Sequence, residues 1–572
     1  MSNRINLFIL PLIFLSVFTV NAGNPLTTSW DSSWTVHTSA SLFKQGNADI
    51  DEYVISDRRI RWLQGNWTIK KAGGHYYTIF PLGVSVVAAP FVYIFNNFLD
   101  LDIVKDWQQI ERLSASCIVA ICAMFIYLIA GKFLNKPRSL LVTFIFAFCT
   151  SAWSIATRAL WQHCPSMLML TITLYFLILA RKKPYLIQFA GLSLAFAYLV
   201  RPLNILSAAG LSLYVLIFYR KYFLYYIFWF LLIITPFLFH NLSVYGSLLP
   251  SYFVRRTWGI HISIFERLIG NLISPSRGFF TFSPVLLFSL WGVFLKVSRK
   301  KLEKFDIFLL AVITLHWTAI SLIPYWCGAA SFGTRYFSDM VPYFVYFLIP
   351  AIPGVTKVAG MARRPASYVF LVFVVVSFFI HYRGATKEET WYWNIEPLDI
   401  KYCQERAWNF KDLQFLRGTK TQDYLRSYSA FFNKELKTYK INEQVSIGNN
   451  DTLFFAEGWS YPEPIHRWSE RNYASLVLKL GDAGNDCAKY QFRLTAKTLM
   501  KQEIDIFVNG SFAGKLQFEY KRQSKTMELD SKLLRFNDIN TIGLYVPFIK
   551  KPGNGDRRIL GIALFDFSIN KM

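Results

Sequence analysis

The sequence has few charged residues and lacks the short motifs that identify many enzymes and transporters. Asp, Glu, Lys and Arg make up only 17% of its 572 residues. It contains no CxxC, HExxH, Walker or dinucleotide-binding pattern. Metal-dependent hydrolysis within helices and nucleotide-driven transport therefore have no support. The seven cysteines are also uninformative. Cys117, Cys122 and Cys149 fall in apolar helical stretches, whereas Cys403 and Cys487 can pair in an oxidising compartment or stay free.

The main feature of the sequence is a series of long apolar blocks. Hydrophobic residues make up 53% of the chain and its mean hydropathy is +0.30. Blocks of roughly 15 to 22 residues are long enough to cross a hydrocarbon core about 30 Å thick. The sequence therefore predicts a polytopic α-helical membrane protein with about eleven transmembrane helices. We expect these spans near residues 7–20, 112–131, 140–157, 164–180, 186–200, 203–219, 222–240, 279–295, 307–323, 338–352 and 367–381.

The basic residues predict the orientation of these spans. The net charge is +25, from 61 basic and 36 acidic residues, and most basic residues lie in short loops between apolar blocks. This distribution follows the positive-inside rule and does not indicate nucleic-acid binding. We expect a cytoplasmic N-terminus and an extracytoplasmic C-terminus. The first span also resembles a signal peptide with a cleavage site at Val20-Asn21-Ala22. The basic residues that share one side are Lys132, Lys136, Arg138, Arg181, Lys182, Lys183, Arg220, Lys221, Arg299, Lys300, Lys301, Lys304, Arg363 and Arg364.

The apolar block 79–99 does not fit this arrangement. If it were a span, every later basic loop would change sides. Pro81 and Pro90 also disfavour a straight transmembrane helix there. We therefore predict that this segment lies at the outer interface, within a first outer loop over 21–111.

The C-terminal part has a different pattern. After Lys420 the chain alternates short apolar and polar runs, with turn residues at Asn509-Gly510 and at 553–555. This predicts an all-β, jelly-roll-like sandwich over 446–572, a linker region over 382–445 and a transmembrane catalytic domain over 1–381. We expect strands over 452–456, 474–480, 491–496, 503–508, 515–520, 541–546 and 559–567.

Asp31 is the leading candidate for chemistry because it stands just outside the first span, in Trp30-Asp31-Ser32-Ser33. A carboxylate at headgroup depth can accept a proton from an attacking hydroxyl near a lipid phosphate. Asp is also a favoured N-cap, so the same residue can simply begin a helix near Ser32. The segment 34–43 that follows is amphipathic and is predicted to lie on the membrane surface.

Several basic residues near the outer boundary are candidates for binding a phosphate. A guanidinium near the membrane is costly, and a bound phosphate is the simplest reason for several to converge. Snorkelling to the lipid headgroups is the alternative for each one. The candidates are Arg58, Arg59, Arg158, Arg201, Arg277 and Arg335, with His163 and His75 as further donors.

The order of these features resembles the C-type (GT-C) glycosyltransferases that use polyprenyl-phosphate sugars, such as the aminoarabinose transferases and protein O-mannosyltransferases, and in particular bacterial members with an outer β-sandwich tail. The matching pieces cover nearly the whole chain. They are Asp31 with 39–42, 75–83 from His75 to Gly83, 160–163, Arg201-Pro202, Asn241 with 245–247, 274–278 with Ser283-Pro284, 331–336, and Gly458-Trp459-Ser460 with Glu463 and Trp468.

The resemblance implies a function and a role for Asp31. It implies an enzyme that transfers a sugar from a polyprenyl monophosphate to a glycan or lipid acceptor outside the cytoplasmic membrane of a bacterium, with inversion and with Asp31 as the base. This chain departs from the family pattern because Ser32 stands where an acidic residue is common, and because Arg158 and His163 replace a second carboxylate. Either Asp31 handles the proton alone, or Asp49, Asp51 or Glu52 assists it, with His75 and Tyr76 as further candidates near the acceptor. The sequence indicates no definite cofactor, and a divalent cation stays an unsupported alternative, since a lone carboxylate is a weak site for one.

Two further alternatives remain open. In the tail, Trp459, Glu463 and Trp468 can contact a growing glycan, or can pack the sandwich. A flippase for lipid-linked glycans or an O-antigen-type polymerase would also be polytopic with outer arginines. A transporter, however, usually shows ionisable residues at mid-membrane depth or inverted repeats, and neither is evident here.

Overall fold

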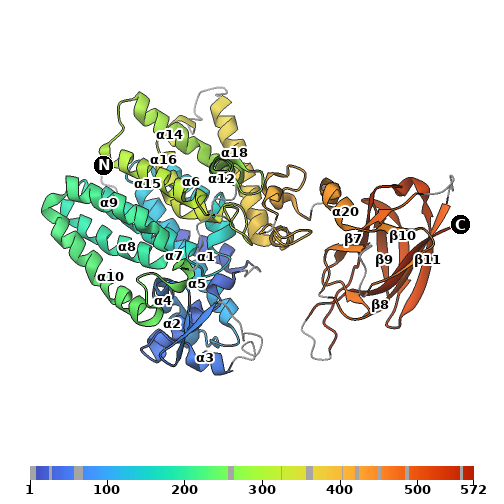
Figure 1. Ribbon diagram of the computed structural model, residues 1–572. Coiled ribbons are helices and arrows are strands. Elements are labelled where there is room, and N and C mark those ends of the chain that lie inside the picture. Colours follow the sequence, from blue (N-terminus) through green and yellow to red (C-terminus); the bar gives the residue numbers. More distant parts are fainter. Residues whose placement is uncertain are drawn as a thin grey trace. The chain divides into compact units, whose positions relative to one another are not determined.

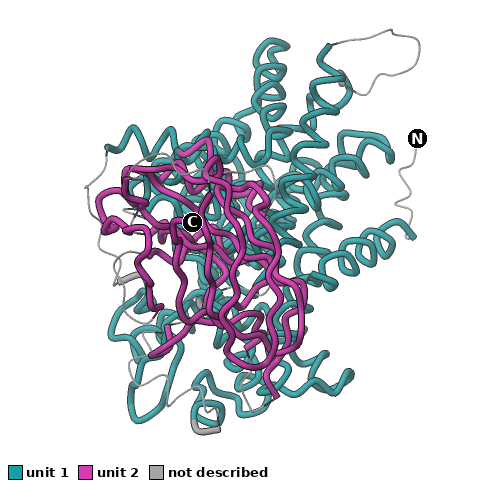
Figure 2. The backbone as a smooth tube through the Cα atoms, turned by 90° about the vertical axis from the view of Figure 1, so that its right-hand side faces the viewer, with its two compact units in different colours: residues 1–391, 404–408 teal, residues 392–403, 409–572 magenta. Residues whose placement is uncertain are grey.

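The computed structural model divides into two compact units, residues 1–391 with 404–408, and residues 392–403 with 409–572 (Figure 2). The first is helical and the second is built mainly of strands (Figure 1). The structure describes residues 8–24, 29–56, 68–254, 263–323, 325–355, 365–401, 403–418, 424–447, 453–460, 462–482, 489–553 and 558–572.

The helical unit contains a helix at each of the expected spans. Of the described residues, five helices are long and apolar enough to cross a membrane: α5, α7, α10 with its preceding turn, α15 and α18. Shorter apolar helices occupy most of the other predicted spans. The main helices are α1 (Ile9–Ala22), α5 (Trp107–Ala130), α6 (Lys136–Phe148), α7 (His163–Ala180), α8 (Ile187–Val200), α9 (Ile205–Phe218), α10 (Phe223–Tyr245), α14 (Leu287–Ser298), α15 (Lys304–Ser321), α16 (Val341–Leu348) and α18 (Pro365–Thr386).

Shorter elements connect these helices. They are α2 (Thr35–Lys44), α3 (Asp51–Ser56), α4 (Leu82–Phe98), α11 (Ser251–Val254), α12 (Ile264–Ile273), α13 (Phe279–Phe282), α17 (Ile352–Val355) and α19 (Glu389–Tyr392), with a hairpin of β1 (Ile69–Ala72) and β2 (His75–Thr78). The residues Thr35 to Ser41 of α2 are buried without interruption. The helix α2 therefore packs against other parts of the unit, and its place at the membrane surface stays a prediction. The helix α4 continues through Pro90, and its place at the interface stays a prediction.

The two ends of α7 define the two ends of the helical unit. This helix has 18 residues, which corresponds to a length of about 27 Å, close to the thickness of a hydrocarbon core. His163 begins it, and Arg181 follows its last residue. At the second end, Arg181 pairs with Glu303 at 2.8 Å and Lys296 pairs with Asp306 at 2.7 Å. These contacts bring together basic loops that the sequence places on one side of the membrane.

The second unit is a β-sandwich of two mainly antiparallel sheets. One sheet has the order β10-β9-β12-β7-β3, with β5 also on β7, and the other has the order β11-β8-β13-β4, with β6 on β13. The strand β3 is parallel to β7. The strands are β3 (Thr438–Tyr439), β4 (Gln444–Ser446), β5 (Leu453–Glu457), β6 (Arg467–Trp468), β7 (Tyr473–Leu480), β8 (Lys489–Thr498), β9 (Gln502–Val508), β10 (Ser511–Phe518), β11 (Gln523–Asp530), β12 (Ile539–Tyr545) and β13 (Ile562–Lys571).

All seven expected strands overlap strands of the sandwich, which confirms the predicted fold class of a helical membrane protein with a C-terminal β domain. The strand β11 was not expected, because its side chains are mostly exposed and polar. It forms because its whole length pairs with β8.

The segment before the sandwich folds in the same unit and includes α20 (Ser429–Glu435). Its buried Asp412 accepts hydrogen bonds from Arg417 and Tyr428, each at 2.5 Å. Whether this segment acts as a linker stays a prediction, as does the functional division of the chain. The pairing of Cys403 with Cys487 also stays a prediction, since Cys487 lies outside the described residues.

Candidate functional site

A short 3-10 turn, η1 (Trp30–Ser32), positions Asp31. The backbone N–H of Asp31 donates to the Ser29 hydroxyl at 3.1 Å, and the Ser32 hydroxyl donates to the Ser29 carbonyl at 3.1 Å. The following helix α2 begins at Thr35, with Trp34 as its N-cap residue. The structure therefore does not use Asp31 as the N-cap of this helix, and the carboxylate is directed elsewhere.

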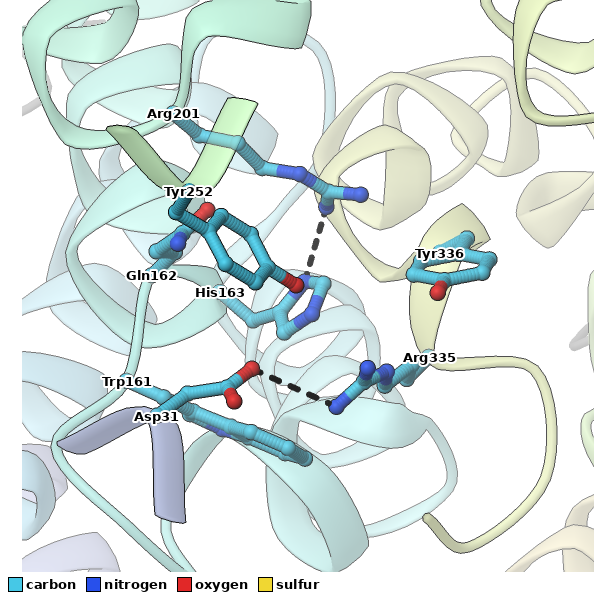
Figure 3. Close-up of a pocket in the computed structure, with 8 residues that line it drawn as sticks. All are labelled: Asp31, Trp161, Gln162, His163, Arg201, Tyr252, Arg335 and Tyr336. Carbon is cyan, nitrogen blue, oxygen red and sulfur yellow. Dashed lines mark hydrogen bonds and ion pairs between the residues drawn. The ribbon is translucent and has the colours of Figure 1, made fainter. Parts of the chain in front are cut away.

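That carboxylate lines a small pocket of about 10 Å³ at the His163 end of the helical unit. Its side chain is 19% exposed, and its Oδ2 lies 3.6 Å from Nη1 of Arg335 (Figure 3). The guanidinium of Arg335 also lies over the rings of Trp161 and Tyr336, at 5.4 and 5.2 Å from their centroids. The lining residues are Asp31, Trp161, Gln162, His163, Arg201, Tyr252, Arg335 and Tyr336.

The Asp31–Arg335 pair is loose. Hydrogen-bonded ion pairs are typically about 2.7–2.9 Å apart, which is clearly shorter than the separation here. The Nε of Arg335 is buried and makes no hydrogen bond within the described part of the chain. Burial opposes the charge of Arg335, but Tyr336 and Asp31 raise the pKa of its guanidinium above the usual value. Arg335 is thus a firmly charged donor with capacity for a further anion.

A second ion pair on the same pocket is tight and buried. Arg201 is paired directly with Asp339, and its Nη1 lies 2.8 Å from Nδ1 of His163 (Figure 3 shows the Arg201–His163 contact). The Nδ1 of His163 is also 3.6 Å from Oδ1 of Asp339. The Asp339 side chain has no exposed surface. Sequence reasoning missed this residue, which neutralises Arg201.

Two expected phosphate ligands lie outside the lining of this pocket. The guanidinium of Arg277 donates to the carbonyls of Cys327 at 2.5 Å, Ser276 at 2.9 Å and Ala329 at 3.2 Å. Burial lowers the pKa of Arg277 to about 10. In this structure Arg277 therefore stabilises the loop that precedes Arg335.

Arg158 is also buried, and its Nε and Nη2 have no hydrogen-bond partner among the described residues. Burial lowers its pKa to about 10, and the charge of Glu388 partly offsets this. Arg58 and Arg59 lie outside the described residues. Of the predicted phosphate ligands, the structure therefore places Arg201, Arg335 and His163 in the lining of the Asp31 pocket.

Glu111 was also missed by the sequence analysis. This residue near the start of α5 is buried, and its Oε1 accepts a hydrogen bond from the backbone N–H of Leu160 at 2.8 Å. Its carboxylate also bonds the Ser32 side chain. Glu111 therefore joins the turn that carries Asp31 to the loop that carries Trp161. An acidic residue at the edge of an apolar block was the available signal, but it does not reveal these partners.

A separate polar cluster forms around His75 on the β1–β2 hairpin. The Nδ1 of His75 is 2.7 Å from Oδ2 of Asp51 and 3.9 Å from Oδ2 of Asp49, and Asp51 also accepts from the Tyr76 N–H at 2.7 Å. One ligand atom of each of Asp49, Asp51 and His75 lies within 4.8 Å of the others, so these residues could hold a metal ion. None of them lines the Asp31 pocket.

The expected glycan contacts of the sandwich differ in their accessibility. Trp468 is buried with Leu560 and Phe565. Trp459 is half-buried and donates its indole N–H to the Ser475 carbonyl at 2.7 Å. Glu463 pairs with His466 at 3.0 Å and Arg558 at 3.1 Å. The Trp468 ring therefore packs the sandwich, whereas part of Trp459 remains accessible.

Comparison with known proteins gives similarities at the level of structure. No family model and no curated protein sequence matches the chain. The chain is similar to the apo crystal structure of ArnT from Cupriavidus metallidurans (14% identity, TM-score 0.40, 76% of this chain and 82% of that one).

The second ArnT structure, bound to undecaprenyl phosphate, gives 13% identity and a TM-score of 0.40 over the same shares of 76% and 82%. The arabinosyltransferase EmbB from Mycobacterium smegmatis gives 10% identity and a TM-score of 0.37 over all of this chain, which covers 65% of EmbB.

Proposed function

We propose that this protein is a membrane glycosyltransferase that moves a sugar from a polyprenyl-monophosphate donor to a glycan or lipid acceptor on the extracytoplasmic face of a bacterial inner membrane. The observation that carries this proposal is the loose pair of Asp31 and Arg335, 3.6 Å apart in a pocket at one end of an apolar helical unit. A base and a phosphate-binding cation stand together there, beside the region where a lipid tail would lie.

Arg335 is the best candidate for binding the donor phosphate. Its charge is kept by its neighbours, its Nε is unbonded among the described residues, and its contact with Asp31 is longer than a hydrogen-bonded pair. A phosphate can therefore displace the carboxylate with little loss. His163 and Arg201 line the same pocket and supply further donors. Asp339 balances the charge of Arg201, so that Arg335 contributes most of the positive potential.

Asp31 is suited to act as the base once the phosphate has taken over Arg335. The acceptor hydroxyl gives its proton to Asp31 while its oxygen attacks the anomeric carbon. The bond from that carbon to the phosphate oxygen breaks, and the leaving phosphate keeps the electron pair. Arg335 then stabilises the charge that develops on this oxygen. Because base and phosphate flank the sugar, a single displacement gives inversion. Asp49 and Asp51 remain candidates for assisting the acceptor, although they lie in a separate cluster.

The sandwich is proposed to hold the glycan acceptor near the membrane. Trp459 offers part of a ring for stacking on a sugar, with Glu463 as a polar neighbour. Trp468 contributes to the core beneath. No metal is needed for this mechanism, and the cluster of His75, Asp49 and Asp51 is a possible but separate cation site.

The proposal is tested by following radiolabelled sugar from a panel of polyprenyl-phosphate donors into glycan and lipid fractions of membranes. Wild type should transfer label from at least one donor, and Asp31→Asn should lower the rate by about 10²- to 10⁴-fold because it removes the base. Asp100→Asn is the matched control. Asp100 is exposed with φ 53°, a conformation that Asn tolerates.

Normal transfer by Asp31→Asn would contradict the role of Asp31. If wild type transferred no label from any donor, a flippase or an O-antigen-type polymerase would become the better hypothesis.

A further inference from the structure

The helical unit has a second pocket at the end opposite Asp31. It has a volume of about 240 Å³, is open to the surface and is lined by Arg181, Tyr214, Phe218, Tyr219, Glu303, Lys304 and Phe305. These residues come from the C-terminal ends of α7 and α9 and from the start of α15. All three helix ends lie at the edge of the apolar region, where we expect the lipid headgroups.

The charges in this pocket are only partly balanced. Arg181 pairs with Glu303 at 2.8 Å. Lys304 lies over the Phe218 ring, with its Nζ 5.1 Å from the centroid, and forms no ion pair within the described parts of the chain. The neighbouring Lys296 differs, since it is bonded to Asp306 at 2.7 Å and to the Tyr346 hydroxyl at 3.0 Å. Of these two lysines, the one that lines the pocket, Lys304, is therefore the one without a carboxylate partner in the described parts of the chain.

The surroundings add further positive charge. The adjacent connections carry six further exposed basic side chains, and their one acidic residue, Glu303, is already paired with Arg181. The six are Lys182, Lys183, Arg220, Lys221, Lys300 and Lys301. Basic pockets between transmembrane helices on the cytoplasmic side bind anionic lipid headgroups. Charge complementarity thus favours a phosphate-bearing ligand over a neutral or cationic one.

An apolar path leads away from the pocket along α9. Tyr214 and Phe218 line the pocket, and the adjacent Leu213 and Ile217 are 49% and 51% exposed. Because residues four apart share one face of a helix, Leu213 and Ile217 form a continuous apolar strip. A ligand with a phosphate and an acyl chain would contact both the basic pocket and this apolar strip, whereas free inorganic phosphate would contact only the pocket.

We propose that this pocket binds the phosphate headgroup of an anionic membrane phospholipid, with Lys304 and Arg181 contacting the phosphate and an acyl chain lying along α9. This site is distinct from the donor pocket, and its binding does not depend on the proposed transfer reaction.

The test measures thermal unfolding of the full-length protein in nanodiscs, together with lipid retention by native mass spectrometry. Phosphatidylglycerol should raise the unfolding temperature relative to phosphatidylcholine and remain bound to the wild-type protein. Lys304→Gln should weaken retention about fivefold, as expected for one basic residue near the membrane surface. Arg181→Gln should weaken it as well. Lys136→Gln, which removes an exposed charge from α6 outside the pocket, should leave retention unchanged.

Three results would overturn the proposal. One is equal retention of phosphatidylglycerol by wild type and both pocket variants. Another is an equal thermal shift with phosphatidylcholine. The last is an equal shift from millimolar inorganic phosphate in detergent, which would assign the site to a soluble phosphate. Lys304→Gln keeps the Arg181–Glu303 pair, so it distinguishes lost binding from misfolding. Sugar transfer is measured on the same samples and should not change.

Discussion

The two ends of the helical unit hold buried charge in different ways. At the basic end, Asp306 bonds Lys296 and the Tyr346 hydroxyl at 2.7 and 2.8 Å, and its other oxygen bonds the Glu303 N–H at 2.9 Å. At the Asp31 end, one pair is direct and buried, Arg201 with Asp339, and one is loose, Arg335 with Asp31. A tight pair maintains the fold, whereas a loose pair can exchange its partner for a ligand. The difference indicates which charges are available for chemistry.

The largest expected effect is on the tight pair beside the pocket. Asp339→Asn leaves the buried guanidinium of Arg201 without its counter-charge, and breaking such a pair typically costs about 3–5 kcal/mol of stability. Asp306→Asn is the matched variant at the other end. Thermal unfolding in detergent should show a loss for both, but only Asp339→Asn should weaken donor binding. Equal donor binding by the two variants would mean that Asp339 does not organise the pocket.

The next prediction compares the roles of two buried arginines, Arg335 and Arg277. Arg335→Gln should lower the transfer rate by about 10²- to 10³-fold, as is typical when a donor to developing negative charge is removed, with little change in unfolding temperature. Arg277→Gln should lower the unfolding temperature and change the transfer rate little, because its guanidinium donates to three backbone carbonyls. Kinetics and thermal unfolding of both proteins check this. A larger catalytic loss for Arg277→Gln than for Arg335→Gln would restore Arg277 as the phosphate ligand.

A smaller effect is expected for the residue that joins Asp31 to the opposite wall. Glu111→Gln keeps an oxygen for the Leu160 N–H but replaces the second carboxyl oxygen with an amide group, and the loss of one hydrogen bond typically costs about 0.5–1.5 kcal/mol. Because Glu111 acts through Ser32 and Leu160, kcat should fall while the affinity for the donor stays the same. A change in donor affinity alone would show that Glu111 does not position Asp31.

The last expected difference lies within the sandwich. Trp468→Ala should destabilise this unit by about 3–5 kcal/mol, as for other large core truncations, because Trp468 is 6% exposed. Trp459→Ala should destabilise it less and instead weaken binding of the glycan acceptor. Unfolding and glycan-binding measurements on the full-length variants test this, and unchanged glycan binding by Trp459→Ala would leave Trp459 with a packing role only.

Much of the fold follows from the sequence because long apolar blocks and alternating runs are local signals. The sequence also pointed to Asp31, Arg201, Arg335 and His163, which the structure gathers in one pocket. It did not indicate Asp339, because the partners of this residue lie at positions 163 and 201, far away in the chain. Nor did it indicate that carbonyl groups occupy Arg277, because backbone acceptors carry no residue-type signature.

The burial of the amphipathic segment 34–43 could not be predicted for a similar reason. An amphipathic pattern shows that one face is apolar, but the neighbours of a helix decide whether the polar face meets water or other protein. In this molecule the small polar side chains of α2 are buried: Ser39 donates to the carbonyls of Thr35 at 2.8 Å and Ser85 at 2.9 Å. The helix is therefore satisfied inside the protein.

The central claim is that a phosphate can replace Asp31 as the partner of Arg335. Its most direct test is the dissociation constant of a polyprenyl phosphate such as undecaprenyl phosphate, measured for wild type, Asp31→Asn and Arg335→Gln. If the phosphate displaces Asp31 from Arg335, Asp31→Asn should bind the lipid as tightly as wild type or more tightly, although it transfers sugar far more slowly. Arg335→Gln should bind the lipid at least tenfold more weakly. Equal weakening of binding by both variants would contradict the account, because Asp31 would then support the pocket rather than act as its base.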